Sequence, residues 1–110
     1  MKRIASALLL VASLSANAEF MSGNKLLDAL NMEPGIQRGA AMGYIMGISD
    51  MGWGFTHCTP GSVTLGQILD LVRNHLTASP EIRHRTGDIL VTQVLGATWP
   101  CQKKQKGQEL

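Results

Sequence analysis

Apolar and small residues recur at helical spacing through most of this chain. The first such segment, residues 25–30, places three leucines on one side and ends before Pro34 and Gly35. A second segment runs from Ile36 to about residue 55. No stretch shows the strict alternation of apolar and polar residues that marks a half-buried strand. The pattern therefore predicts an all-α fold.

Two further helical segments follow. Thr64 and Gln67 form a capping-box signature at the start of the third. An apolar stripe follows them at core-facing positions: Leu65, Ile68, Leu69, Val72 and Leu76. Ser79 and Pro80 predict the N-cap and first position of a fourth helix that reaches about Ala97. Its predicted buried residues are Ile82, Ile89, Leu90 and Val94, with Leu95 at the margin. We expect one domain of about four helices.

The second segment contains a row of glycines at Gly39, Gly43 and Gly47. Each glycine inside a helix costs up to about 1 kcal/mol relative to alanine, so three of them need compensation. Close approach of another helix would supply it. Two arrangements are open, tight packing inside one domain and a seam between two copies, and the pattern favours the first.

The first eighteen residues have the features of a secretory signal peptide. Lys2 and Arg3 precede an apolar run, and the run ends at small residues that signal peptidase accepts, with cleavage near Ala18. The run is too short to cross a bilayer, so no stable membrane anchor is expected after cleavage. A buried N-terminal helix is the alternative. The predicted organisation is a signal peptide over 1–18, a domain over 19–101 and a basic flexible tail over 102–110.

The positive charge of the chain lies mostly outside the predicted domain. The sequence has ten Lys and Arg against eight Asp and Glu. Cleavage removes two of the cations, so the mature chain is close to neutral. The remaining excess lies at Lys103, Lys104 and Lys106 in the tail. Because a nucleic-acid-binding domain usually carries a basic face on a folded element, no nucleic-acid partner is expected.

Cys58 and Cys101 are the only cysteines. In an oxidising compartment, an even number in so short a chain predicts a disulfide. Such a bridge would restrict the unfolded chain by about 4 kcal/mol in the entropic model. A metal or thiol site is the alternative, since His57 precedes Cys58. However, the spacings of zinc sites are absent, and no metal is expected.

No catalytic motif is present. The histidines, at positions 57, 75 and 84, lack metal-ligand spacing, and the glycine-serine motif of hydrolases is missing. We therefore expect no enzyme activity, no catalytic residue and no cofactor. Some charged residues stand out and are candidates for binding a partner, although for the cationic cluster the pattern favours a solvated helical face over a contact surface for an acidic partner. These candidates are Asp50, His57, Arg83, His84 and Arg85.

Four short motifs together resemble a known family. They are Phe20-x-x-Gly23-x-x-Leu26-Leu27, Gly43-Tyr44-Ile45-x-Gly47-Ile48-x-Asp50, Cys58-x-Pro60 and Trp99-Pro100-Cys101. Their order and spacing resemble the Rap/Tai family of periplasmic immunity proteins, which protect bacteria from type VI secreted peptidoglycan amidases. Members often have a second cysteine pair. Here Ala29-Leu30-Asn31 and Gly39-Ala40-Ala41 occupy those regions, so that bridge is missing.

The resemblance implies a periplasmic protein that binds an amidase effector and blocks its active site. It implies a small all-α fold, and because members are often dimeric it leaves a homodimer open. A small periplasmic acid-stress chaperone is the alternative function. An enzyme would instead show a deep pocket with converging titratable groups.

Overall fold

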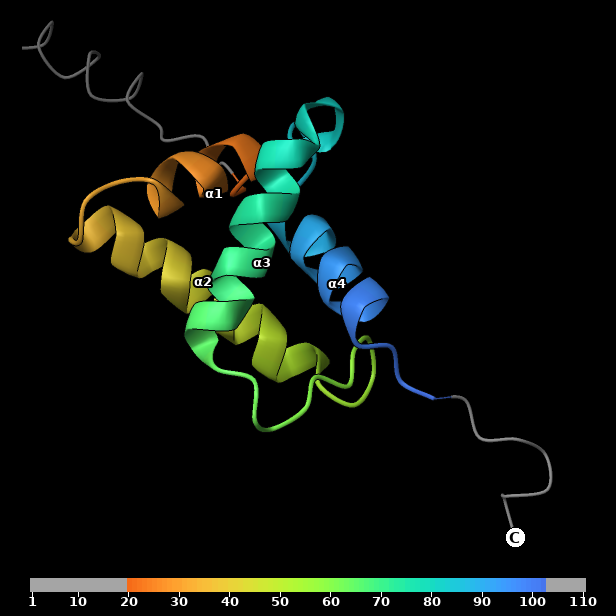
Figure 1. Ribbon diagram of the computed structural model, residues 1–110. Helices are drawn as coiled ribbons and strands as arrows, with labels where there is room; N and C mark the ends of the chain where they lie inside the picture. The colour runs from red at the N-terminus through yellow and green to blue at the C-terminus, as the bar shows by residue number, and fades with distance from the viewer. Residues whose placement is uncertain (1–19, 103–110) are drawn as a thin grey trace, which may run out of the picture.

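The computed structural model describes residues 20–102 (Figure 1). The predicted signal peptide and nearly all of the predicted tail lie outside these residues. The helices are α1 (Gly23–Leu30), α2 (Ile36–Gly52), α3 (Leu65–Ala78) and α4 (Gly87–Thr98), with a short 3₁₀ turn, η2 (Pro80–Ile82), before α4. The described residues contain isolated β-bridges and no strand. The predicted all-α fold is thus confirmed.

Polar side chains fix the starts of α1 and α3. The Ser22 hydroxyl accepts a hydrogen bond from the Lys25 backbone N–H at 3.2 Å. Thr64 accepts from the Gln67 N–H at 3.2 Å, while the Gln67 side chain accepts from the Thr64 N–H at 2.7 Å. This reciprocal pair satisfies two N–H groups that lack partners within the helix. The capping box predicted from the sequence is therefore present.

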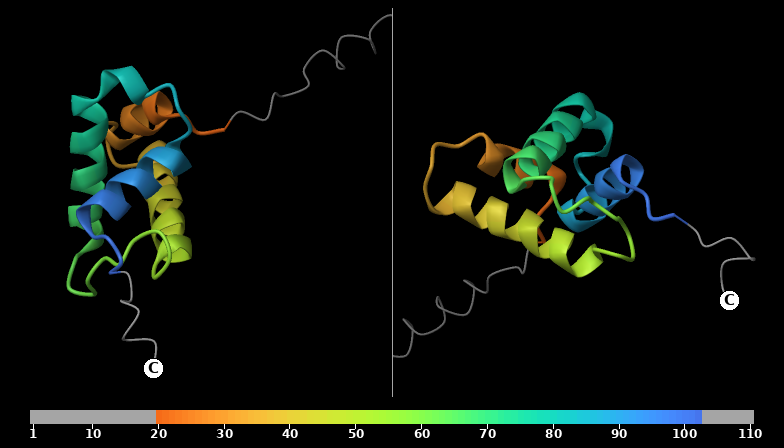
Figure 2. Two further views of the ribbon diagram at one scale, coloured as in Figure 1. Left: turned by 90° about the vertical axis from the view of Figure 1, so that its right-hand side faces the viewer. Right: turned by 60° about the horizontal axis from the view of Figure 1, so that its bottom comes forward.

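One apolar core joins all four helices. Its fully buried large side chains are Leu26, Leu30, Ile45, Val72, Leu76, Leu90, Val91 and Leu95. α1 packs on α2 and α3 near one end of the molecule, and α2 also packs along α4 (Figures 1 and 2). As a result, the chain after α2 emerges beside the C-terminal end of α4.

The fourth predicted helix is divided in two. Residues 83–86 are not helical, because their backbone pairs with the start of α1 instead. The N–H groups of Gly23 and Asn24 donate to the carbonyls of Arg85 and Arg83, each at 2.9 Å. α4 therefore begins only at Gly87, and Ser79 makes no side-chain cap. The prediction of a continuous helix from Pro80 was wrong.

The division also changes which residues are buried. Leu90, Val94 and Leu95 lie in the core as predicted, whereas Ile89 is 47% exposed. Ile82, on the separate 3₁₀ turn, is only partly buried. The predicted stripe had assumed one helical register across residues 80–97, and the break removes that register.

α2 buries few of its side chains. Its buried residues are Ala41, Ile45 and Ser49. The glycine row lies on the opposite side: a Cβ atom added at Gly39, Gly43 or Gly47 would meet no atom within 4 Å. The preference for tight packing of these glycines inside the domain was therefore wrong. None of the helices in residues 20–102 is long and apolar enough to span a membrane.

Candidate functional site

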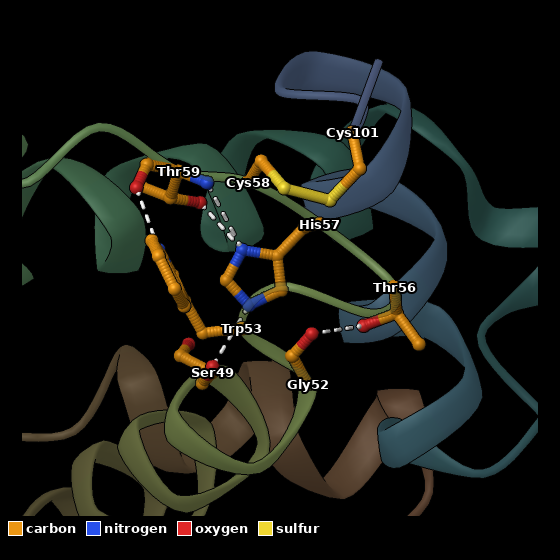
Figure 3. Close-up of a disulfide and its surroundings, with 8 residues drawn as sticks. All are labelled: Ser49, Gly52, Trp53, Thr56, His57, Cys58, Thr59 and Cys101. Carbon is orange, nitrogen blue, oxygen red and sulfur yellow. Dashed lines mark hydrogen bonds between the residues drawn. A yellow bond between two sulfur atoms is a disulfide. The ribbon is translucent and has the colours of Figure 1, made fainter. Parts of the chain in front are cut away.

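The turn that follows α2 is held in place by a disulfide and by several hydrogen bonds. We call residues 53–59 the clasped turn. Its centre is His57, which is only 1% exposed although it lies outside any helix. The imidazole lies between the end of α2, at Ser49, and the chain segment at Thr59 (Figure 3).

Hydrogen bonds hold both ring nitrogens of His57. Nε2 donates to the backbone carbonyl of Ser49, 2.8 Å away, since a carbonyl can only accept. Nδ1 lies 2.7 Å from the Thr59 hydroxyl. The Ser49 hydroxyl in turn donates to the Ile45 carbonyl at 2.8 Å. The histidine therefore connects the turn to the buried face of α2.

A disulfide fixes the far side of the turn. Cys58 is bonded to Cys101, with the two Cα atoms 4.8 Å apart, which confirms the predicted bridge (Figure 3). Beside it, the Cys58 N–H donates to the Trp99 carbonyl at 2.8 Å. The turn is thus attached both to α2 and to the chain that leaves α4.

Glycines make this close packing sterically possible. Gly54 has φ of +84°, a left-handed conformation that other residues adopt only at a cost. On α4, a Cβ atom at Gly96 would lie 2.7 Å from the Thr56 carbonyl oxygen, so only glycine lets the turn approach the helix this closely.

The rigid turn presents aromatic side chains to solvent. Phe55 is 86% exposed and Trp53 is 59% exposed. The Trp53 indole N–H donates to the Thr59 carbonyl at 2.9 Å, which orients the ring (Figure 3). Exposed aromatic side chains on a preorganised loop are typical of protein-binding surfaces.

An open apolar groove of about 540 Å³ adjoins the turn. It lies between α2 and α4 and is lined by Gly43, Tyr44, Gly47, Ile48, Met51, Gly52, Thr56 and Thr92. Tyr44 is the one lining residue that titrates. Burial and the nearby Asp88 carboxylate raise the pKa of its phenol, although the backbone N–H of Asp88 partly offsets this by donating to the oxygen. The hydroxyl therefore stays protonated at neutral pH.

The structure separates the residues predicted to bind a partner. Asp50 is exposed on the last turn of α2, beside the clasped turn. His57 is internal, so any contact there would be made by its neighbours. Arg83, His84 and Arg85 lie next to the start of α1, at the opposite end of α4 (Figure 1). Their contact with a partner stays a prediction, and they do not form one surface with Asp50.

Arg83 is also tied into the fold. Its backbone carbonyl accepts from α1, and its buried Nε finds no acceptor among residues 20–102. His84 and Arg85 are exposed. In the same described range, no three His, Cys, Asp or Glu side chains form a group that could hold a metal ion.

The sequence analysis missed Trp53 and Phe55. A signal was present, since two aromatic residues lie between glycines and just before a cysteine in a turn. The helical pattern extends to about residue 55, so it places both residues in the last turn of the second helix. Only the end of α2 at Gly52 and the burial of His57 show that both rings belong to a separate, fixed loop.

A small helical domain with a disulfide-fixed loop and exposed aromatic rings has the form of a protein-binding module. Comparison with known families identifies the family of proteins to which this domain belongs. The family model described as Rap1a immunity proteins matches residues 22–101, and the chain belongs to this family. Membership implies immunity to a secreted effector protein through binding, and the family is generally non-catalytic. No curated protein matches the chain significantly.

Proposed function

We propose that this protein acts in the periplasm, where it binds a type VI secreted peptidoglycan amidase and blocks its active site. Family membership supports the immunity role. The motifs shared with the Rap/Tai family support an amidase as the effector. The signal-peptide pattern and the disulfide both support export to an oxidising compartment.

The observation that carries the proposed binding mode is the exposure of Phe55 on a fixed turn. An exposed aromatic ring in water is unfavourable, and this one is 86% exposed in a loop held by a disulfide and a buried histidine. Because the loop is already ordered, binding loses little conformational entropy there. Phe55 is the proposed anchor, and Trp53 and Met51 extend the apolar contact beside it.

Inhibition then needs no chemistry by this chain. The clasped turn would cover the entrance to the active site and exclude the peptidoglycan substrate. Asp50, exposed one turn before Trp53, would lie at the polar rim of this contact. The cationic segment at Arg83–Arg85 lies at the other end of α4 and would contribute only if the amidase extends that far.

Titration of the amidase with the mature protein tests the proposal. Phe55→Ala should weaken inhibition by roughly thirtyfold or more, which corresponds to the 2 kcal/mol typical of an anchor residue. Phe20→Ala is the matched control, since Phe20 is also an exposed phenylalanine, at 82%, but lies near the start of α4. Circular dichroism should show both variants folded.

Two results would contradict the proposal. Full amidase activity at saturating wild-type protein would remove the inhibitor function. Equal inhibition by wild type and Phe55→Ala would remove the clasped turn as the binding site. The chaperone alternative predicts that the protein prevents aggregation of unrelated unfolded proteins in acid, and the family match favours the immunity function over it.

A further inference from the structure

The backbone just before α1 is fastened to the chain that precedes α4. The Met21 carbonyl accepts a hydrogen bond from the Gly87 N–H at 2.7 Å, and Ser22 forms an isolated β-bridge with Thr86. The next two N–H groups, at the start of α1, donate to carbonyls of the same segment. Each residue from 21 to 24 is therefore held by a backbone contact to a part of the chain that is distant in sequence.

Two glycines allow this close contact. A Cβ atom on Gly23 would lie 2.8 Å from the Arg83 carbonyl oxygen, and one on Gly87 would lie 3.2 Å from the Met21 carbonyl oxygen. A side chain at Gly23 would force the two segments apart, and one at Gly87 would crowd them. The fixed part of the domain therefore begins at Met21, before the first turn of α1.

The predicted signal-peptide cleavage point lies very close to this start, although it falls outside the described residues. Cleavage after Ala18 leaves only Glu19 and Phe20 before Met21. Two residues span at most about 7 Å when fully extended. That is less than the diameter of one helix with its side chains, about 10 Å. Because a protease binds an extended chain on both sides of the bond it cuts, the folded domain would collide with the enzyme.

We propose that the folded domain shields the bond between Ala18 and Glu19, so that signal peptidase cuts it only while Met21 is detached from Gly87. The reaction is a hydrolysis, in which water adds across the bond and leaves a carboxylate on Ala18 and an amine on Glu19. Cleavage of a shielded bond requires local opening, and its rate falls with the population of the open form. A precursor that folds before cleavage therefore keeps its signal peptide.

The order of residues along the chain gives cleavage its opportunity. Gly87 lies more than sixty residues after Met21, so during export it reaches the far side of the membrane much later. Until then the Met21 carbonyl lacks the N–H group that holds it, and the bond after Ala18 is accessible. This inference rests on the export that is part of the proposed function, and it is independent of the effector and of the clasped turn.

Cleavage of the folded full-length precursor by purified signal peptidase in detergent tests the inference. One variant has about eight Gly and Ser residues inserted between Phe20 and Met21, which separates the bond from the domain without changing the contacts of residues 21–24. The matched control has the same insertion after Gln105, in the predicted tail. Wild type and this control should be cut at least about tenfold more slowly than the first variant. Circular dichroism should show equal helix content in all three.

Translocation into membrane vesicles that contain signal peptidase is the second measurement. The chain arrives there unfolded, so wild type and the first variant should be processed at equal rates, and mass spectrometry of processed wild type should show Glu19 at the new N-terminus.

Two results would overturn the inference. Equally fast cutting of the folded wild type and the first variant would show that the domain does not shield the bond. Absence of processing of both chains in vesicles would remove the signal peptide, and with it the proposed export. Failure of the amidase proposal is recognised separately, because inhibition is measured on the mature protein and does not depend on how fast the precursor is cut.

Discussion

Single residues decide how firmly the clasped turn is held. His57 was predicted as a candidate surface contact, and the structure gives it an internal position with both ring nitrogens engaged. A buried polar ring is stable only if it is hydrogen-bonded, and here the backbone of α2 supplies one partner. The exposed aromatic residues beside it depend on this histidine for their position.

Replacement of His57 by alanine should lower the free energy of unfolding by about 3 kcal/mol. The change leaves a cavity and removes the hydrogen-bond partner of a buried carbonyl. Urea denaturation followed by circular dichroism would measure the loss. His84→Ala, at an exposed position, is expected to change stability by less than about 0.5 kcal/mol. Equal effects of the two variants would show that the His57 contacts do not stabilise the turn.

Residue types in local motifs were predicted well from sequence. The cysteine pair and the Thr64 cap follow from chemistry that needs only the residue itself and a near neighbour. The burial of His57 could not be predicted in this way. It depends on Ser49, eight residues earlier, and on the disulfide that brings the chain back.

At the scale of elements, glycines with similar sequence context have opposite surroundings. Gly96 on α4 lies against the Thr56 carbonyl, whereas Gly66 on α3 has only the Thr64 hydroxyl nearby, at 3.8 Å. Glycine is required at the first position and costs helix stability at the second. No periodicity in the sequence distinguishes them.

Alanine substitutions at these positions should therefore have opposite signs. Gly96→Ala forces the clasped turn away from α4, and we expect a loss of about 2 kcal/mol. Gly66→Ala should gain up to about 1 kcal/mol from helix propensity. Thermal unfolding of the two variants, compared with wild type, would show one lower and one higher midpoint. Destabilisation by Gly66→Ala would contradict this account of α3.

The positions of helices were predicted more accurately than their packed faces. α1, α2 and α3 occur where the apolar period placed them. The break before α4 was missed because it arises from hydrogen bonds to α1, more than fifty residues away in sequence. The glycine row of α2 was misjudged because periodicity shows that a helix has apolar faces and not which partner covers each one.

For the molecule as a whole, the disulfide closes the fold. It joins residues 43 apart in sequence and encloses α3, η2 and α4 in one covalent loop. In a domain with a small core, such a constraint forms a large part of the net stability.

Replacing both cysteines with alanine should lower the free energy of unfolding by up to about 4 kcal/mol, mainly because the unfolded chain gains freedom. Denaturation of wild type with and without a reductant provides the same comparison without mutation. Inhibition should fall in parallel, since the clasped turn loses one of its two attachments. A reduced protein with unchanged stability and unchanged inhibition would show that the hydrogen bonds alone hold the turn.

The location of Cys101 near the end of the domain also affects when the disulfide could form. A chain that crosses a membrane N-terminus first delivers α1, α2, α3 and α4 before Cys101 emerges. In the proposed export, the bridge would therefore form only after the whole helical domain has reached the far side of the membrane. Partly translocated chains would leave Cys58 as a free thiol beside an unanchored loop. Under that proposal the bond would mark the completion of export, and the clasped turn would be attached on both sides only in molecules that have completed it.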